Sequence, residues 1–497
     1  MLRNHSRLRS TTALLALVAL GCGGGGGGGD GGGGPAPTPR PTPTVPAGPT
    51  PTPQPPAGSA RIILQNGDVS SDGVVVGNIE DAALARNGNL SVIVARDSGS
   101  GDHIVLEAGP DRQFEVLFDE TNAPADVDLG TLTRLRMAPT GEIAFLSGTG
   151  LDTDKLHYAA DGEVRTIAGG PPGVVKPDFR VLGNFRIVSG GIVAFTGGAE
   201  DCVQETTGDT VRNRCTLALY LADRTQVVRI EHEGFLLEER LANDAQIAIN
   251  ESGDAYFSLP GRRESPMLIR YADGEVEALL QRESELPGLG LLSRIDVVDL
   301  DEQGRLLVEL GLVPENEDDP ILDHVGLLDG DRLETFAREG TIENGLVLER
   351  VRGIGLGGGA ALFEVTLRDP ATDEAKLCLR LGNAEEVVDV VCEGDPFAGG
   401  TNVVFTIEGA RINAVGDVLF VSQLGRRNDD TTFLEETRAT VRRIDGEYVT
   451  IASSKDSGIL GAVTALNSVG FDDSGNVLLI AERDATNDRV LLIGGSR

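Results

Sequence analysis

The chain has 497 residues, and its 77 Asp and Glu against 43 Lys and Arg give a formal net charge of −34 at pH 7. This excess of negative charge argues against nucleic acid and anionic lipid surfaces as partners, because both require clustered positive charge. The sequence contains no Trp and 5 Tyr. Sugar sites and protein hot spots favour the faces of these two side chains, so the composition disfavours carbohydrate binding. We interpret the acidity as a source of solubility for an exported protein rather than as a cation site.

The N-terminus has the three parts of a secretory signal. Three arginines precede an apolar run over residues 13–20, and a small residue, Gly21, follows. This order predicts a signal peptide over residues 1–21. A helix as long as the apolar run spans about 12 Å, far less than the ~30 Å of a bilayer core, so the run does not predict a membrane-spanning segment.

Cys22 directly follows this signal. The sequence Ala19-Leu20-Gly21-Cys22 resembles the lipobox of bacterial lipoproteins, in which the cysteine is diacylated and becomes the new N-terminus. Ala19 departs mildly from the leucine preferred at that position. The resemblance implies lipidation at Cys22 and attachment to the bacterial cell envelope, at the outer membrane or the cell surface. An ordinary secreted protein cut nearby is the alternative.

A long segment without apolar patterning follows the cysteine. Residues 23–34 are nearly all glycine and residues 35–57 are rich in proline. The first part predicts a flexible coil and the second a polyproline-II spacer that reaches up to about 70 Å. We therefore expect a disordered tether over residues 22–58 and one folded domain over residues 59–497.

Four further cysteines form two close pairs in the sequence, Cys202 with Cys215 and Cys378 with Cys392. Four cysteines allow three connectivities. In an exported protein the local pairing is the natural one, and each bridge closes a loop of about 15 residues, worth ~3 kcal/mol in the chain-entropy model. Metal sites use closer cysteine spacing with histidines nearby, so we expect two structural disulfides.

One phrase recurs through the expected folded domain: a small turn that contains glycine, followed by an apolar, β-prone run. Eight copies occur about 55 residues apart, with turns at Asn87-Gly88, Thr140-Gly141, Ser189-Gly190, Ser252-Gly253, Gln303-Gly304, Gly358-Gly359, Val415-Gly416 and Ser474-Gly475. Two more strands follow each run and one precedes each turn, as in RLRMAP, FRIVSG and ARINAV. Each unit is therefore predicted to be a four-stranded antiparallel meander.

Runs such as VLFVS are apolar on successive residues, which fits strands covered on both faces, as in radially stacked sheets. We therefore predict an all-β fold, a β-propeller of eight blades, with seven as the alternative. The last unit stops after its third strand, and residues 60–69 resemble the end of an earlier unit. We expect this N-terminal segment to supply the missing strand and close the ring.

The best-preserved local phrase is Glu393-Gly394-Asp395-Pro396-Phe397-Ala398-Gly399. It resembles a motif of uncharacterised tandem-repeat proteins found in bacterial exported and lipid-anchored chains. The resemblance extends over about residues 60–497 and implies a propeller-like fold and an envelope location. It implies no activity.

Several patterns spell known motifs without their structural context. Gly353-x-Gly355-x-x-Gly358 matches a dinucleotide fingerprint, but AALFEV follows it as a strand where the fingerprint needs a helix. The segment from Asp299 to Gly304 begins like a calcium loop, yet Leu310 stands where the loop needs glutamate. The acidic loops at 315–319 and 428–430 are interpreted as solvated surface.

The histidines give no catalytic or metal signature. His232-Glu233 lacks a second histidine at metalloprotease spacing, and His103, His157, His232 and His324 are scattered one per unit. No nucleophile elbow, P-loop or paired-cysteine metal motif occurs in the sequence. The sequence therefore indicates no catalytic residue, no cofactor and no metal.

We expect a non-catalytic interaction or binding scaffold. The expected partners are the membrane, through the lipid anchor, and a protein of the cell envelope, with no nucleic acid, and the protein is expected to be a monomer. The alternative is a propeller hydrolase or lyase with a metal held by carboxylates in the central channel. Converging carboxylates or histidines at the channel mouth would favour the enzyme, whereas an axis lined by small apolar residues would favour the scaffold.

Overall fold

The computed structural model divides into two units, residues 1–50 and 51–497, and all the described residues belong to the second. They are 60–85, 87–96, 103–109, 113–119, 121–123, 132–148, 155–160, 162–169, 182–198, 203–207, 210–214, 217–223, 226–230, 246–259, 266–281, 284–286, 289–313, 321–330, 332–397, 401–428, 431–455, 463–483 and 489–496. Cys22, Cys202, Cys215, His232 and the acidic loop at 315–319 lie outside the described residues.

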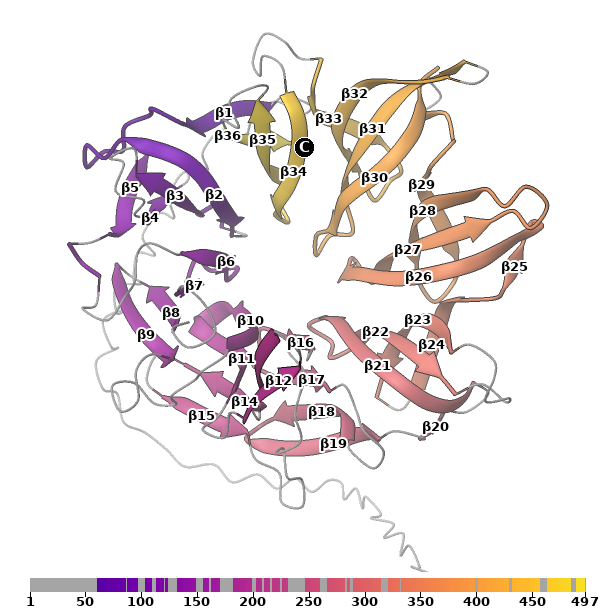
Figure 1. Ribbon diagram of the computed structural model, residues 1–497, viewed down its shortest axis with the longest axis horizontal. Helices are drawn as coiled ribbons and strands as arrows, with labels where there is room; N and C mark the ends of the chain where they lie inside the picture. Colours follow the sequence, from indigo (N-terminus) through magenta and orange to yellow (C-terminus); the bar gives the residue numbers. More distant parts are fainter. Residues whose placement is uncertain are drawn as a thin grey trace, which may run out of the picture. The chain divides into compact units, whose positions relative to one another are not determined.

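Eight antiparallel sheets form a ring of blades, so the predicted eight-bladed β-propeller is confirmed (Figure 1). Blade 1 consists of β2 (Val76–Leu84), β3 (Leu90–Arg96), β4 (His103–Ala108) and β5 (Phe114–Phe118). Blade 2 consists of β6 (Thr133–Met137), β7 (Ile143–Ser147), β8 (Lys155–Ala160) and β9 (Glu163–Gly169). Blade 3 consists of β10 (Leu182–Val188), β11 (Ile192–Gly198), β14 (Leu217–Ala222) and β15 (Val227–Ile230). Blade 4 consists of β16 (Gln246–Ile249), β17 (Ala255–Ser258), β18 (Pro266–Ala272) and β19 (Glu275–Gln281).

The second half of the chain continues the same order. Blade 5 consists of β20 (Glu285–Leu286), β21 (Gly290–Leu300), β22 (Leu306–Leu312), β23 (Leu322–Asp329) and β24 (Arg332–Arg338). Blade 6 consists of β25 (Ile342–Glu343), β26 (Leu346–Gly357), β27 (Ala360–Arg368), β28 (Ala375–Gly382) and β29 (Val387–Cys392). Blade 7 consists of β30 (Val403–Ile412), β31 (Val418–Asn428), β32 (Thr431–Arg442) and β33 (Tyr448–Ser453). Blade 8 consists of β34 (Val463–Phe471), β35 (Asn476–Arg483), β36 (Arg489–Gly495) and β1 (Ala60–Gln65).

Three blades add elements to the four-stranded pattern. A separate hairpin of β12 (Val203–Thr207) and β13 (Thr210–Arg214) is inserted between the second and third strands of blade 3. The short 3₁₀ segment η2 (Ser189–Gly191) forms the first turn of that blade. Blades 5 and 6 each begin with an extra two-residue strand. Within the described part of the chain, no helix has the length and apolarity needed to cross a membrane.

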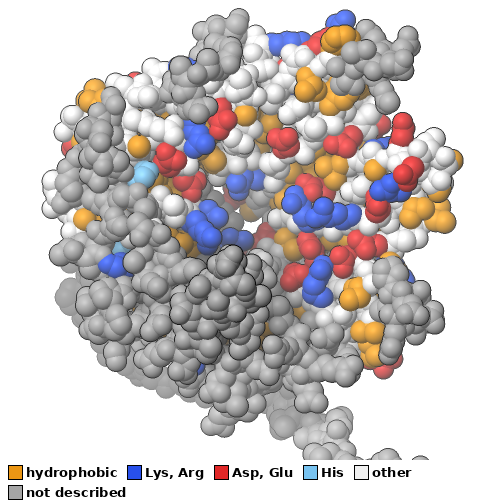
Figure 2. All heavy atoms as spheres, in the orientation of Figure 1, with side chains coloured by type: hydrophobic (Ala, Val, Ile, Leu, Met, Phe, Trp, Pro, Cys, Tyr) orange, Lys and Arg blue, Asp and Glu red, His pale blue; other side chains and the backbone are white. Residues whose placement is uncertain are grey.

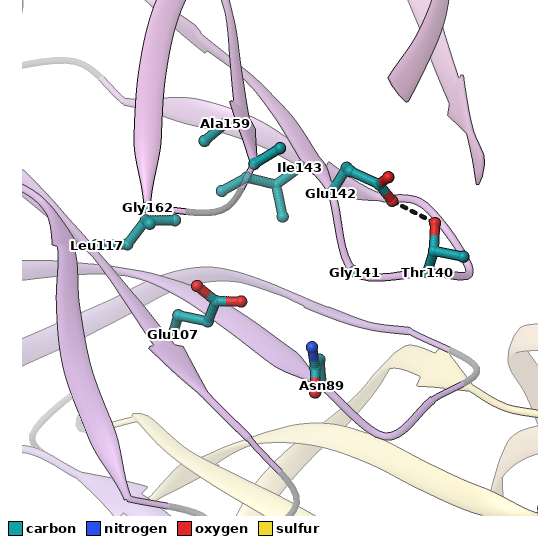
Figure 3. A pocket seen from close by; sticks show the side chains of 10 residues that line it. Asn89, Glu107, Leu117, Thr140, Gly141, Glu142, Ile143, Ala159 and Gly162 are labelled. Atoms are coloured by element: carbon teal, nitrogen blue, oxygen red, sulfur yellow. Dashed lines mark hydrogen bonds between the residues drawn. The ribbon is translucent and has the colours of Figure 1, made fainter. Parts of the chain in front are cut away.

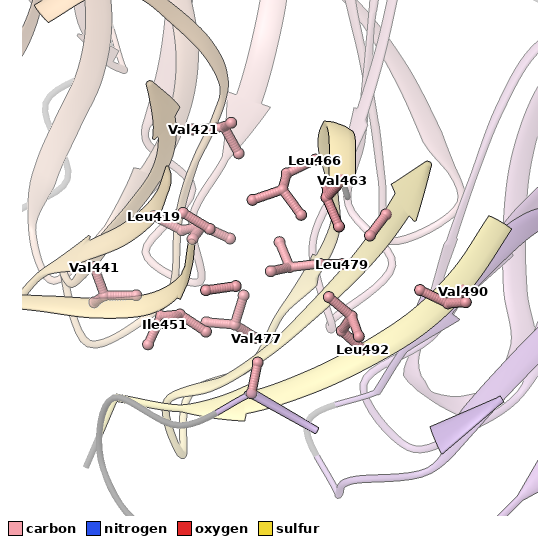
Figure 4. Packing of buried hydrophobic residues seen from close by; sticks show 14 residues of the cluster. Leu419, Val421, Val441, Ile451, Val463, Leu466, Val477, Leu479, Val490 and Leu492 are labelled. Carbon is pink, nitrogen blue, oxygen red and sulfur yellow. The ribbon is translucent and has the colours of Figure 1, made fainter. Parts of the chain in front are cut away.

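The N-terminal strand closes the ring, as predicted. β1 pairs antiparallel with β36, with Ile62 opposite Leu492 and Leu64 opposite Leu491. Blade 8 is therefore built from both ends of the described chain, and its fourth strand leaves no unpaired edge on β36. Ala60 of β1 belongs to the apolar cluster between blades 7 and 8. Figure 4 shows this cluster, with Leu419, Val421, Val441 and Ile451 of blade 7 and Val463, Leu466, Val477, Leu479, Val490 and Leu492 of blade 8.

The recurring glycine turn joins the first and second strands of each blade. Its glycine has positive φ in every copy, for example 85° at Gly88 and 87° at Gly253, a conformation that glycine adopts without steric cost. The fourth residue after this glycine is a fully buried phenylalanine in five blades, Phe145, Phe195, Phe257, Phe363 and Phe420. The repeat therefore encodes both the turn and the apolar packing between blades.

The first long strand of each blade, which in blades 5 and 6 follows the extra two-residue strand, lies nearest the centre of the ring (Figure 1). It is called here the inner strand. The inner strands are β2, β6, β10, β16, β21, β26, β30 and β34, and each contacts the next one around the ring. Register shifts within six of them end at Asp81, Arg136, Asp299, Gly355, Arg411 and Gly470. A bulge re-aims the side chains beside it and often marks a functional site.

Candidate functional site

One register position recurs in all eight inner strands and is called here the ring position. It is the residue paired with the third residue after the turn glycine, which in the double-glycine turns of blades 3 and 6 is the second glycine, Gly191 and Gly359. From blade 1 to blade 8 it is occupied by Ala83, Arg136, Arg186, Ala248, Asp299, Gly355, Arg411 and Gly470. Side chains at the same register of successive inner strands lie at one level of the axial channel. That level carries three arginines and one aspartate between small residues.

The three arginines of the ring position have exposed side chains. Arg411 donates from Nη2 to the backbone carbonyl of Ser468 in blade 8 at 3.0 Å, and Arg136 donates from Nη1 to the carbonyl of Leu135 at 2.8 Å. Arg186 makes no hydrogen bond within the described part of the chain. None of the three has a carboxylate within ion-pair distance among the described residues. Figure 2 shows Lys and Arg side chains on the rim of the central opening.

The arginines lie close enough to influence one another. The arginines are accessible to solvent, but the surrounding blades displace part of their water, and this desolvation lowers the pKa of Arg186 and of Arg411 below the ordinary guanidinium value. The charge of Arg136 also lowers both. Nearby carboxylates oppose this effect, Asp299 for Arg186 and Asp81 for Arg411. Guanidinium groups stay charged at neutral pH, so the channel holds repelling cations.

Two carboxylates accompany the arginines. Asp299 occupies the ring position of blade 5, and Asp81 lies two residues before the ring position of blade 1. Each accepts a backbone N–H from the inner strand of the next blade, Asp81 from Leu135 at 2.9 Å and Asp299 from Leu356 at 2.8 Å. Burial raises the pKa of both carboxyl groups, although these hydrogen bonds oppose the rise. Both carboxylates therefore join neighbouring blades.

A cavity of about 510 Å³ lies beside the ring position. Its wall includes Asp299 at the ring position of blade 5. It also includes Leu356, Ile412 and Phe471, which each follow the ring position of blades 6, 7 and 8 by one residue, and residues of the first turns of blades 5 to 8. A pocket of this size falls in the range used for small molecules. The lining residues include Leu356, Gly357, Gly358, Ile412, Phe471 and Asp473.

The two sequence patterns set aside earlier both line this cavity. Gly353, Gly355 and Gly358 lie at the end of β26 and in its turn, and a strand, β27, follows as expected. The N–H of Gly358 donates to the carbonyl of Ala414 in blade 7 at 2.9 Å, and a Cβ at this glycine would meet the carbonyl oxygen of Val415 at 2.5 Å. The glycines therefore allow two turns to approach each other.

The segment that begins like a calcium loop is a tight hairpin turn. The Asp301 carboxylate accepts the backbone N–H groups of Gln303 and Arg305 at 3.0 and 2.9 Å. It also accepts the Arg305 Nε at 2.7 Å. These bonds engage the carboxylate with its own turn.

A second cavity, of about 190 Å³, lies between blades 1 and 2. Figure 3 shows it lined by Asn89 and Glu107 of blade 1 and by the turn Thr140–Glu142 of blade 2. The Thr140 hydroxyl donates to the Glu142 carboxylate within this wall. This pocket holds carboxylates without any basic lining residue, in contrast to the channel.

The predicted bridge between Cys378 and Cys392 is present. The two residues are direct cross-strand partners in β28 and β29 of blade 6, and both are buried. Their sulfurs and the Asp389 carboxylate lie within 4.8 Å of one another, the one group in the described residues close enough to share an ion. The sulfurs are bonded to each other and Asp389 accepts the Arg380 Nε at 2.7 Å, so this cluster is structural. The other predicted bridge, Cys202 to Cys215, falls outside the described residues.

The described histidines do not converge. His103, His157 and His324 lie in the third strands of blades 1, 2 and 5. His157 is buried and its ring nitrogens lie 2.6 Å from the Ser147 hydroxyl and 3.1 Å from the Thr166 hydroxyl. Both ring nitrogens of His324 are buried without a hydrogen-bond partner. Their separation places them in blade cores, away from the ring position.

Sequence reasoning missed the arginines. The expected alternatives for the channel were converging carboxylates or small apolar residues, and the ring position combines arginines, an aspartate and small residues. The signal was present in RLRMAP, FRIVSG and ARINAV. Each phrase has an arginine in the strand that precedes a glycine turn, and aligning the turns on Gly141, Gly191 and Gly416 would have brought these arginines into one column.

No family model and no curated protein matches the sequence. Among solved structures, the chain is similar to an acylaminoacyl peptidase from Pyrococcus horikoshii, with 12% identity over 82% of this chain and a TM-score of 0.41. It spans 58% of that peptidase. It is also similar to the β-propeller domain of the Trilobed protease from Pyrococcus furiosus, with 12% identity, 76% and 97% coverage of the two chains and a TM-score of 0.39. An oligogalacturonate lyase in complex with manganese matches at 11% identity, 88% and 98% coverage and a TM-score of 0.38.

Proposed function

We propose that this protein is a non-catalytic binding propeller whose binding site is the axial channel. It acts as a monomer held at the bacterial cell envelope by a lipid on Cys22, with the Gly- and Pro-rich segment as a spacer. One observation carries the proposal of a binding site: Arg136, Arg186 and Arg411 come from three separate blades to one level of the channel, and within the described residues none of them has a carboxylate at ion-pair distance. A structural role alone does not require three cations at one level.

The surroundings of the channel carboxylates favour binding over metal-dependent catalysis. Asp81 and Asp299 each accept two backbone N–H groups, one on each carboxylate oxygen, so both carboxylates already hold backbone groups of the inner strands. A divalent cation at this level would also meet the positive charges of the arginines. Within the described residues, no arrangement favours the alternative, a propeller hydrolase or lyase with a metal held by carboxylates.

The first test asks whether the protein turns over a substrate. The full-length chain is incubated with ester, peptide and acidic polysaccharide substrates, with and without Mn²⁺ or Zn²⁺. We expect no product above the buffer control. Metal-dependent turnover that Asp299→Asn abolishes would replace the binding proposal with the enzyme.

The second test concerns the anchor. Wild-type protein expressed with its own signal should partition into detergent, and Cys22→Ala should remain in the aqueous phase with a mature mass that lacks the acyl groups. An unchanged partition and an unchanged mature mass would remove lipidation from the proposal. The matched control is Cys202→Ala, which leaves the signal intact.

A further inference from the structure

The three arginines of the ring position outnumber the two carboxylates that act on them, Asp81 and Asp299, in a protein that is acidic as a whole. Acidic side chains outnumber Lys and Arg by 77 to 43, so a carboxylate partner for each arginine was readily available to the sequence. In the described part of the chain none of the three guanidinium groups has one within ion-pair distance. Repulsion between like charges is stronger inside the ring than in open water. The repulsion among the three arginines therefore costs stability, and an anion bound between them would reduce that cost.

The two nearby carboxylates do not complete the site. Asp81 and Asp299 direct their oxygens to backbone N–H groups of the neighbouring inner strands. Arg411 and Arg136 each donate to a backbone carbonyl, which carries no formal charge. Arg186 donates to nothing in the described chain, so its donors face the channel water.

We propose that Arg136, Arg186 and Arg411 bind a small polyanionic molecule in the axial channel, through its carboxylate, phosphate or sulfate groups. This inference rests on the proposed function in one respect, because it takes the channel as the binding site. The planar guanidinium group presents paired N–H donors that match the two oxygens of such groups. Donors from blades 2, 3 and 7 favour a ligand with several charged groups over a monoanion.

The location and the size of the ligand follow from the channel and from the rest of the surface. None of the three arginines lines the adjoining cavity of about 510 Å³, whose wall includes Asp299, Asp301, Glu302 and Asp473, so the anion is expected at the ring position and not in this cavity. The small residues at the other ring positions pack against neighbouring strands, since a Cβ at Gly470 would meet the Leu84 Cβ at 2.7 Å, so the ligand groups are expected beside the arginines. The net charge of −34 repels large polyanions such as nucleic acids before they reach the channel. A small anion with few charges meets a smaller barrier.

Titration calorimetry of the full-length chain tests the proposal. The probes are citrate, inorganic phosphate, sulfate and acetate, each at the same ionic strength set with chloride, so that general screening is constant. The variants are Arg186→Gln, Arg186→Lys and the control Arg332→Gln, whose exposed arginine lies on β24 at the outer edge of blade 5. Arg186 is chosen because it has no hydrogen bond within the described fold.

We expect citrate to bind the wild type more tightly than acetate does. Arg186→Gln should weaken citrate binding by about tenfold or more, as expected for the loss of a charge-assisted hydrogen bond. The citrate affinity of Arg186→Lys should lie between those of the wild type and Arg186→Gln. The citrate affinity of Arg332→Gln should equal that of the wild type. Circular dichroism of each variant confirms that the fold is retained, and Arg136→Gln provides a second test of the same site.

Three outcomes would overturn the proposal. They are the absence of binding by every probe, equal binding by wild type and Arg186→Gln, and an equal loss in Arg332→Gln. The turnover assay reports separately on the proposed function, since an enzyme could still bind citrate through these arginines.

Discussion

The second strand of each blade keeps one type of residue at a fixed position, whereas the inner strand varies in residue type at the ring position. Four residues after the turn glycine, the second strand carries Phe in five blades and Val92, Val308 or Leu479 in the other three, all fully buried. The ring position of the inner strand, which pairs with the residue just before this buried one, is occupied by Arg, Asp, Ala or Gly in different blades. The repeat thus preserves the packing between blades, and departures from it gather at the channel. In this propeller the constant positions build the fold and the variable position builds the candidate site.

The largest expected effect comes from removing the strand that completes blade 8. Deleting residues 59–66 should expose the edge of β36, because β1 pairs with it from Ala60 to Gln65. We expect loss of soluble protein and a large fall in the midpoint of thermal unfolding. Deleting residues 35–57, outside the described residues, is the matched control and should leave both unchanged. A deletion of 59–66 as soluble and heat-resistant as the parent would show that β1 is dispensable.

The constant position should respond strongly to truncation. Phe363 is fully buried in β27, and Phe363→Ala should lower the free energy of unfolding by about 3–5 kcal/mol through lost burial and the cavity left behind. Phe363→Leu, which retains most of the volume, should cost about 1 kcal/mol. Urea denaturation gives both values. Equal costs for the two variants would mean that packing at this position is loose.

Replacing His324 tests whether the interior of a blade accommodates a positive charge, as the channel accommodates its arginines. Burial, together with the nearby charge of Arg338, lowers the pKa of His324 to about 4. Because this folded-state pKa lies below the unfolded value, His324 stabilises the fold above pH 6.5, and this contribution is lost as the pH falls toward 4. His324→Leu should remove that loss and gain roughly 3 kcal/mol relative to wild type near pH 4.

Urea denaturation between pH 7.5 and 4 measures this difference. Comparing variant with wild type at each pH removes the contribution of the raised carboxyl groups such as Asp299, which both chains share. At pH 7.5 the histidine is neutral in both states, so any difference there reports only the change in packing and polarity. A constant difference across the range would assign the histidine an ordinary pKa.

Substitutions at the ring position should change the free energy of unfolding least. Whether the variant is less or more stable than wild type should depend on which arginine is replaced. Arg411→Gln removes hydrogen bonds from Nε and Nη2 to Ser468 in blade 8 and should cost about 1–2 kcal/mol. Arg186→Gln removes a cation that Arg136 repels and should leave the free energy of unfolding unchanged or raise it, in buffer without polyanions. Thermal unfolding of both variants checks the order. A larger loss in Arg186→Gln than in Arg411→Gln would give Arg186 a structural role.

The sequence predicted the propeller because its signals are local and repeated. Each glycine turn and the apolar run after it specify a hairpin by themselves, and eight copies give the number of blades. The pairing of β1 with β36 was also predictable, since Asn66-Gly67-Asp68 repeats the Glu393-Gly394-Asp395 turn of blade 6. The bridge between Cys378 and Cys392 followed from spacing alone.

The candidate site depends on a different kind of information. Arg136 and Arg411 are distant in sequence and meet only when the inner strands share one register around the ring. Bulges end at both residues, and a period-two strand pattern does not indicate where a bulge falls. The added strands β20 and β25 and the β12–β13 hairpin were also missed, because none of them belongs to the repeat.

Closure of blade 8 also sets an order of events during synthesis. Ala60 in β1 pairs with Gly494 in β36. β1 is synthesised before every other strand, so it cannot pair until β36 has also been synthesised. Contacts between such distant residues form slowly, because the chain between them must first become ordered. Blades 1 to 7 can form as hairpins while synthesis continues, but the ring cannot close until the chain is complete. The fold thereby couples its final closure to the end of chain synthesis.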